Sequence, residues 1–291
     1  MSATADIAAP VRELTPAQRA WRRLVRRRGA MVALAVILFF VALAVLAPYI
    51  APYDPLKTNF LAVRKPPGGA YLFGTDEIGR DMLSRVIWGA RASLLAGVVS
   101  VTIALTLGVP LGMLAGYMGR WVDALISRMT DAMLACPPLI LAIALAYTLG
   151  PSLTSAMIAI GVTTTPVFAR LARAQVLTVK TEDYVEAARA IGNSHLRIAV
   201  RHILPNIVPP LLVQVTLAIA AAIIAEASLS FLGLGQQPPA PSWGSMLNVA
   251  KNYIGNAPWM AVWPGVSIFL VVLSFNLLGD GLRDALDPRH R

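Results

Sequence analysis

The sequence predicts an all-α integral membrane protein with six transmembrane helices. Hydrophobic residues make up 57% of the 291 residues and charged residues only 14%, well below the charged share of roughly 25% that is typical of soluble globular proteins. The apolar residues are concentrated in blocks long enough to cross the hydrocarbon core of a bilayer, which takes about 20 residues of helix. Six such blocks are present: Ala30 to Tyr49, Leu94 to Gly116, Met129 to Leu149, Leu153 to Ala169, Ile207 to Leu232 and Met260 to Asp280.

The first block is interpreted as an uncleaved membrane helix rather than a signal peptide. Its apolar run is close to a full membrane span, whereas the apolar region of a signal peptide has roughly 7 to 15 residues. Most of the 25 lysine and arginine residues fall in segments that are cytoplasmic if the N-terminus is cytoplasmic. Positive charge accumulates on the cytoplasmic side of membrane proteins. The sequence therefore predicts a multi-pass protein of the cytoplasmic (inner) membrane with both termini in the cytoplasm.

The spans divide the chain into five parts. Between the first two spans, Ile78, Met82 and Val86 recur at helical spacing beside charged residues, which predicts an amphipathic helix on the outer membrane surface. The parts are a basic cytoplasmic N-terminal tail (1–29), the first transmembrane helix (30–50), an extracytoplasmic loop with the amphipathic helix (51–92), a five-helix core (93–280) that includes a long cytoplasmic segment (170–206), and a cytoplasmic C-terminal tail (281–291).

Small residues and prolines indicate how the spans pack. Gly108, Gly112 and Gly116 recur every four residues, so they share one helix face that another helix can approach closely. Pro137 and Pro138 interrupt the third predicted span, where a kink is expected because proline has no N–H to donate. Three aromatic residues are expected to anchor the sixth span at the membrane interface: Trp243, Trp259 and Trp263.

The sequence lacks the motifs of several enzyme classes. No lysine stands in a phosphate-binding loop of the GxxxxGK[S/T] kind, and the three histidines do not form the HExxH pattern of zinc proteases. Cys136 is the single cysteine, so an intrachain disulfide is excluded. The net charge of +10 comes from arginines that flank apolar blocks, which favours membrane topology over nucleic-acid binding. We therefore expect a chain that is not an enzyme and that binds no cofactor, metal or nucleic acid.

The long cytoplasmic segment carries strong signals for the ends of helices. Asp183 is expected to cap a short helix, with Glu186 three residues later completing a capping box. Gly192 is expected to end this helix, because glycine accepts the left-handed backbone conformation of a C-terminal cap.

A second short helix is expected directly after this glycine. Asn193 or Ser194 can cap it, and Pro205 would stop it. Two short helices with a sharp turn can read DNA in other proteins, but a pair held between two membrane spans is poorly placed to enter a groove. A rigid protrusion that docks into a partner and transmits motion to the spans is the favoured interpretation.

This segment resembles the EAA loop of the permease subunits of ATP-binding-cassette (ABC) importers. The elements that occur at the spacing of that loop are Glu186-Ala187-Ala188, Gly192 and Leu204-Pro205. In that family the glycine-turned helix pair docks into a groove of an ATP-hydrolysing subunit. The resemblance implies the ABC importer permease fold and assigns ATPase coupling to eight residues: Asp183, Tyr184, Glu186, Ala187, Ala188, Gly192, Leu204 and Pro205.

Three further stretches resemble the C-type subunits of the oligopeptide and dipeptide branch of that family. They are Phe73-Gly74-Thr75-Asp76 with Gly79-Arg80-Asp81, Gly116-Tyr117 with Asp123, and Glu226 to Gly235. The resemblance implies import of oligopeptides or dipeptides, with nickel, glutathione or a similar small solute as the alternative. The implied partners are a second homologous permease subunit, two ATPase subunits or domains that bind ATP and magnesium, an extracytoplasmic solute-binding protein and membrane lipid.

Polar residues inside the spans are candidates for the translocation pathway. A carboxylate is costly in hydrocarbon, so Glu226 is expected either to line the passage or to make a hydrogen bond between helices. Ser228 and Ser230 follow it on the same span. Asp131 lies near the start of the third span, where Arg128 could pair with it. An ion channel and a membrane-embedded enzyme remain as alternatives from other functional classes.

Overall fold

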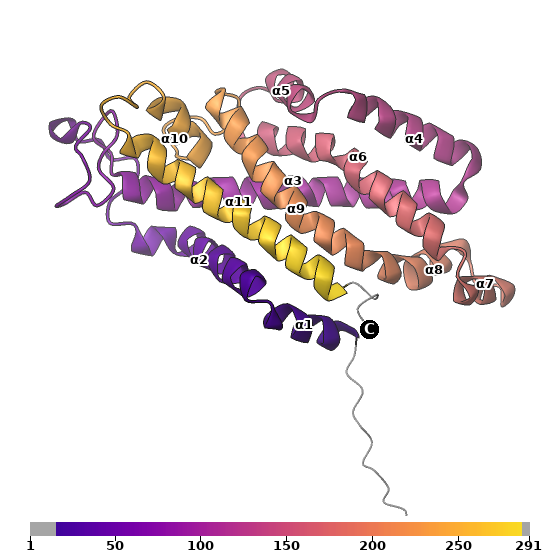
Figure 1. Cartoon of the computed structure of the whole chain (residues 1–291). Coiled ribbons are helices and arrows are strands. Elements are labelled where there is room, and N and C mark those ends of the chain that lie inside the picture. Colours follow the sequence, from indigo (N-terminus) through magenta and orange to yellow (C-terminus); the bar gives the residue numbers. More distant parts are fainter. Residues whose placement is uncertain (1–15, 287–291) are drawn as a thin grey trace, which may run out of the picture.

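The computed structural model describes residues 16–286, and the regular secondary structure in this range is helical (Figure 1). The elements in chain order are α1 (Pro16–Arg26), α2 (Arg28–Ile50), η1 (Phe60–Ala62), α3 (Met82–Met118), α4 (Arg120–Ala135), α5 (Pro138–Leu149), α6 (Leu153–Val179), α7 (Asp183–Ala190), α8 (His195–Ile198), η2 (Ala199–Ile203), α9 (Leu204–Phe231), α10 (Trp243–Ala250) and α11 (Trp259–Leu286). Here η1 is a 3₁₀ turn and η2 is a π-helical turn. The described chain is therefore all-α, as the sequence predicts.

Five helical stretches are long and apolar enough to cross a membrane, and α4 with α5 makes up to six. The five are α2, α3, α6, the continuous stretch from His195 to Phe231, and α11. The pair α4 and α5 covers the third predicted span, and its two helices are bent by 92°, so the kink predicted there is confirmed. Pro137 and Pro138 lie at the bend. Proline has no N–H and disfavours helical conformation in the residue before it, so α4 ends there.

The second span begins earlier than the sequence predicts. Helix α3 starts at Met82 and runs for 37 residues, and its N-cap Asp81 accepts a hydrogen bond of 2.8 Å from the Ser84 N–H. The predicted amphipathic surface helix in residues 51–92 is therefore wrong, because Met82 and Val86 lie in the first turns of α3 and Ile78 lies in the loop before it. Met82 and Val86 are buried in the core of the bundle rather than exposed at a membrane surface.

Helices α3 and α6 pack with their backbones in close contact. A Cβ added at Gly112 would lie 2.2 Å from the carbonyl oxygen of Ala169, and one at Gly108 would lie 2.6 Å from that of Thr165. Such separations are too short for any real Cβ, so only glycine fits at these positions. Gly116 packs against α6 in the same way. The glycine face predicted from the sequence is confirmed, and the structure identifies α6 as its partner.

The bundle has two different ends (Figure 1). The loop of residues 51–81 and α10 lie at one end, and α7 and α8 lie at the other. Trp243, the first residue of α10, is fully buried, and its indole N–H donates a hydrogen bond of 3.0 Å to the carbonyl oxygen of Val86 in α3. The predicted role of Trp243 as an interfacial anchor is therefore wrong. This tryptophan belongs to the core and joins α10 to α3.

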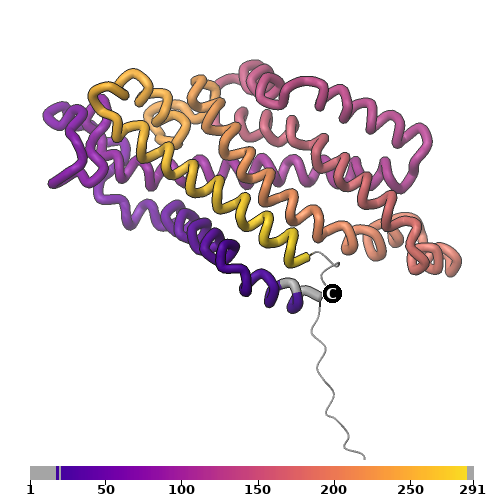
Figure 2. Tube along the Cα trace, viewed as in Figure 1, coloured from indigo at the N-terminus to yellow at the C-terminus, as the bar shows by residue number. Residues whose placement is uncertain are grey.

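The first and last described helices lie side by side (Figure 2). Leu24 of α1 packs with Ala285 of α11, and the Arg27 guanidinium forms an ion pair with the Asp284 carboxylate. The end of α11 also lies beside the last turns of α6 and the first turns of α9. Helix α1 and the end of α11 are therefore on the same side of the bundle as α7.

Adding a single methyl group at Gly112 is expected to separate α3 from α6. Gly112→Ala should lower the free energy of unfolding by about 1–3 kcal/mol, the usual range for overpacking, because the new Cβ meets backbone atoms of Ala169 rather than a flexible side chain. Gly265→Ala in α11 is the matched control, since a Cβ there meets nothing within 4 Å and alanine is the better helix former. Unfolding of the purified chain in mixed detergent micelles would compare the variants, and equal stability would contradict the close approach.

Candidate functional site

Helices α7 and α8 and the turn between them form a protrusion, called here the knob (residues 183–198), at one end of the bundle (Figure 1). The N-cap of α7 is Glu182, whose side chain makes no capping hydrogen bond. The predicted capping box of Asp183 and Glu186 is therefore wrong. Both carboxylates lie instead in the first turn of α7, where the positive end of the helix dipole favours negative charge.

Gly192 makes the turn between the two helices. Its φ is +80°, in the left-handed region, and nothing lies within 4 Å of the place that a Cβ would occupy. The Gly192 N–H donates to the Arg189 carbonyl at 3.0 Å, and the Asn193 N–H donates to the Ala188 carbonyl at 3.2 Å. These two bonds form a Schellman cap. Backbone conformation rather than space therefore requires glycine here, and the predicted end of the helix is confirmed.

The second helix of the knob continues into the membrane. Ser194, one of the two predicted caps, accepts a hydrogen bond of 3.4 Å from the Arg197 N–H. The prediction that Pro205 stops the helix is wrong, because Pro205 lies in the first turn of α9, where a missing N–H costs little. Helix α8 passes through the π turn η2 into α9, so the knob and the fifth span form one continuous helical stretch.

The outer face of the knob carries exposed apolar side chains. Val185 and Ala188 face inward and are buried, whereas Ile191 is 80% exposed and Leu196 is 75% exposed. Sequence reasoning missed Ile191 and Leu196, because exposure depends on which face of the knob turns toward the bundle. The other predicted coupling residues divide by exposure: Asp183, Tyr184, Glu186, Ala187, Gly192 and Pro205 are exposed, and Leu204 is half-buried.

Two hydrogen bonds join the end of α3 to the end of α6 and to the knob. The Lys180 ammonium group, directly after α6, donates to the Gly116 carbonyl oxygen of α3 at 2.8 Å. The Tyr117 hydroxyl of α3 lies 2.9 Å from His195 Nδ1 at the start of α8. The position of the knob therefore follows the packing of α3, α6 and α9.

The four predicted pathway residues do not form one cluster. Asp131 pairs with Arg170 of α6 at 2.7 Å. The sequence predicted Arg128 as its partner instead. Both side chains of the observed pair are more than half exposed, and such pairs contribute little to stability. Asp131 lines a cavity of about 330 Å³ between α3, α4 and α6. Ser228 lines a separate cavity of about 220 Å³ between α5, α6 and α9.

Glu226 and Ser230 belong to a buried polar cluster where α3, α9 and α10 meet. The Ser230 hydroxyl donates to one oxygen of the Glu226 carboxylate at 2.7 Å, and the Ser93 hydroxyl of α3 donates to the other at 3.1 Å. The same two hydroxyls accept backbone N–H groups from Gln236 at 3.0 Å and Trp243 at 3.3 Å. Of the two interpretations of Glu226, this geometry matches the hydrogen bond between helices. A role in the passage stays a prediction.

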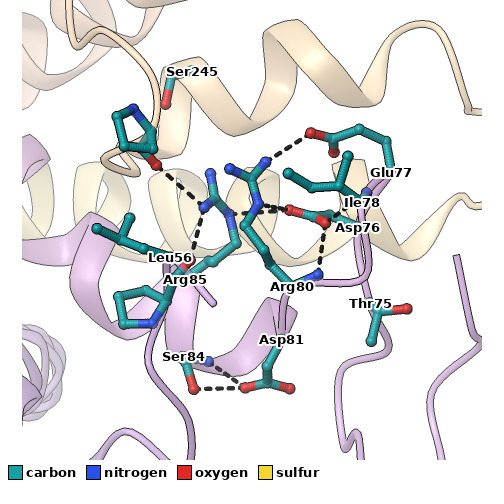
Figure 3. A network of polar contacts seen from close by, with 12 residues as sticks. Leu56, Thr75, Asp76, Glu77, Ile78, Arg80, Asp81, Ser84, Arg85 and Ser245 are labelled. Atoms are coloured by element: carbon teal, nitrogen blue, oxygen red, sulfur yellow. Dashed lines mark hydrogen bonds and ion pairs between the residues drawn. The ribbon is translucent and has the colours of Figure 1, made fainter. Parts of the chain in front are cut away.

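An ionic cluster orders the opposite end of the bundle from the knob (Figure 3). The Arg80 guanidinium contacts the Asp76 carboxylate at 2.5 Å and that of Glu77 at 2.7 Å. Arg85 lies 3.4 Å from Asp76 and donates to the Pro55 carbonyl oxygen at 3.0 Å. Burial raises the pKa of the Glu77 carboxyl, and the charge of Asp76 raises it further. These contacts fasten the first loop to the start of α3.

Comparison with known proteins gives two family matches and several close relatives. Residues 108–291 match the family described as binding-protein-dependent transport system inner membrane component, and residues 15–67 match the N-terminal transmembrane domain of oligopeptide transport permease C. The chain is 46% identical to the dipeptide transport system permease protein DppC of Alkalihalophilus pseudofirmus, over 95% of this chain and 91% of that protein. It is 47% identical to the di/tripeptide transport system permease protein DppC of Pseudomonas aeruginosa, over 94% and 93% respectively.

Two further matches complete the comparison. The chain is 42% identical to the glutathione transport system permease protein GsiD of Pectobacterium atrosepticum, over 94% of this chain and 92% of that protein. Among solved structures, a chain of the MetNI methionine ABC transporter in an inward-facing conformation superposes with a TM-score of 0.58 at 22% identity, over 71% of this chain and 98% of that chain. At this identity the likeness supports a shared fold alone.

Removing either hydroxyl that donates to Glu226 is expected to destabilise the bundle. Ser93→Ala or Ser230→Ala leaves one oxygen of a buried carboxylate without its donor, which should lower the free energy of unfolding by about 1–3 kcal/mol. Ser274→Ala is the control, because this buried serine donates to the Leu270 carbonyl of its own helix. Its loss should change stability by less than about 0.5 kcal/mol. Similar losses for all three variants in detergent unfolding would count against a special role of the carboxylate.

Proposed function

Because this chain belongs to the family of binding-protein-dependent transport system inner membrane components, we propose that it is one permease subunit of an ABC importer for small peptides. The observation that carries the proposal is the knob, a capped turn that is continuous with a membrane-crossing helix. The relatives named for dipeptide, di/tripeptide and glutathione transport support small peptides as the solute class.

In the proposed mechanism, the knob docks into a groove of an ATPase subunit, and the exposed side chains of Ile191 and Leu196 supply apolar contact. The partner subunits bind ATP and magnesium, and their closure draws together the knobs of the two permease subunits. The displacement reaches α9 through η2, and reaches α3 and α6 through the hydrogen bonds of Tyr117 and Lys180. The spans then switch between an inward-facing and an outward-facing packing. The nucleotide state of the ATPase subunits decides which packing is more stable.

In the proposed topology, the knob and both termini face the cytoplasm. The ionic cluster of the first loop then faces outward, where a solute-binding protein delivers the peptide. A second, homologous permease subunit completes the passage. No feature of the described residues favours the channel or the membrane-embedded enzyme over this importer.

Affinity purification of the tagged chain from its native membrane tests the assembly. We expect a second permease subunit and ATPase subunits to be recovered with it and identified by mass spectrometry. Recovery of the chain alone, combined with solute flux or catalysis by the chain unaided, would overturn the importer in favour of a channel or an enzyme.

Substituting proline for the glycine of the knob is expected to uncouple the ATPase. Gly192→Pro cannot adopt the observed φ and loses the hydrogen bond to Arg189. The transport rate and the amount of ATPase subunit that co-purifies with the chain should each fall at least about tenfold. This is equivalent to about 1.4 kcal/mol of docking free energy. Gly233→Pro is the matched control, with a φ of +81°, an equivalent N–H bond to Ser230 and no neighbour within 4 Å, but at the other end of α9. Equal ATPase recovery with both variants would show that the knob does not dock.

A further inference from the structure

A cavity of about 380 Å³ lies between α6, α9 and α11, toward the end of the bundle that carries the knob. Apolar side chains form most of its wall, among them Leu171, Val213 and Leu286. Its polar side chains are Gln175 of α6, Gln214 of α9 and Arg283 of α11. The hollow is open on one side, and its volume falls within the range of about 300–1,000 Å³ that small-molecule sites occupy.

The polar groups of this cavity have no partners of their own. Within residues 16–286, no hydrogen bond or ion pair engages the side chains of Gln175, Gln214 or Arg283. Both glutamines are half-buried and Arg283 is exposed, so their donor groups can be reached by a ligand from solvent. Three side chains from three helices therefore converge with their donor groups unused.

The chemistry of these groups selects an anion. A guanidinium binds a carboxylate through two parallel hydrogen bonds, and each glutamine amide can donate one more. No acidic residue is among the described residues that line the cavity. The apolar wall would meanwhile accommodate the side chains of a ligand that carries the carboxylate.

We propose that this cavity is a solute site near the cytoplasmic mouth of the passage, in which Arg283, Gln175 and Gln214 hold the C-terminal carboxylate of a small peptide. The proposal rests on the importer function proposed above, and it adds the position of the site and the part of the solute that is recognised. None of the three residues was singled out in the sequence, where a glutamine in a span or an arginine after one has an ordinary explanation.

The location of the site couples it to the knob. Gln175 lies near the end of α6 and Gln214 near the beginning of α9, and these two helices flank the knob on either side. Pro209 and Pro210 also line the cavity, and each removes a backbone hydrogen bond from the first turns of α9, which makes that region easier to bend. A displacement of the knob therefore changes the separation of the two glutamines. By linkage, peptide affinity and the nucleotide state of the ATPase must affect each other.

Direct binding to the purified complex tests the site. The nucleotide-free complex, without its solute-binding protein, is titrated with radiolabelled alanyl-alanine and with its C-terminal amide. We expect wild type to bind the free acid at least about tenfold more tightly than the amide, and Arg283→Gln to lose that preference. Arg283→Lys keeps the charge and should retain part of the preference, whereas Gln214→Leu should weaken free-acid binding about threefold.

The matched control is Arg26→Gln, which removes one exposed arginine from α1 on the same side of the bundle and should bind like wild type. Equal affinity of wild type for the acid and the amide would overturn the proposal, and so would an unchanged preference in Arg283→Gln. Binding of phosphatidylglycerol rather than peptide at the site would assign the site to a lipid instead. Co-purification of the partner subunits shows whether a variant assembles. If Arg283→Gln does not assemble, the free-acid affinity of Gln214→Leu decides instead. Failure of the importer function is distinct, because wild type itself would then lack ATP-driven uptake.

Discussion

Direct backbone contact between α3 and α6 is the constraint on which the rest of the structure depends. At Gly108, Gly112 and Gly116 no side chain separates the two helices, so they pack as one unit. The knob end of this unit is fastened by the Lys180 bond to the Gly116 carbonyl. The other end begins at Asp81, beside the ionic cluster that orders the first loop. One rigid helix pair thus joins the first loop to the knob.

Helix α9 is the second connection between the two ends, and its halves differ in stiffness. The half near α10 is held by the Glu226 cluster, in which two serine hydroxyls each accept a backbone N–H and donate to one carboxylate. The half near the knob follows the π turn η2 and contains Pro209 and Pro210. Since each proline removes a hydrogen bond of the helix, bending is easier near the knob than near α10. A displacement of the knob would therefore deform the cavity near the knob before it disturbs the packing near α10.

Local rules of the chain account for the sequence predictions that the structure confirms. Hydropathy depends on composition alone, so the membrane-crossing stretches were predictable, and so was the all-α fold. Gly192 was predictable because left-handed backbone after a helix favours glycine wherever the helix lies. The glycine face of α3 was predictable from four-residue spacing, although its partner was not.

Tertiary contacts decided the points at which the sequence predictions failed. Asp131 has Arg128 within one helical turn, yet it pairs with Arg170, because the packing of α4 on α6 brings the more distant arginine closer. Trp243 has the composition of an interfacial anchor, yet a carbonyl of α3 accepts its indole N–H inside the core. Pro205 would end an isolated helix, but a π turn lets α8 continue into α9.

The sequence by itself determined where the chain can cross a membrane, where its knob turns and which face of α3 can receive another helix. These properties follow from the hydrophobicity, size and backbone freedom of individual residues. Only the tertiary structure decided which helix fills the glycine face, which apolar residues of the knob remain exposed, and that Gln175, Gln214 and Arg283 share one cavity. Those outcomes depend on relative positions of helices far apart in the chain, which no local property of a residue specifies.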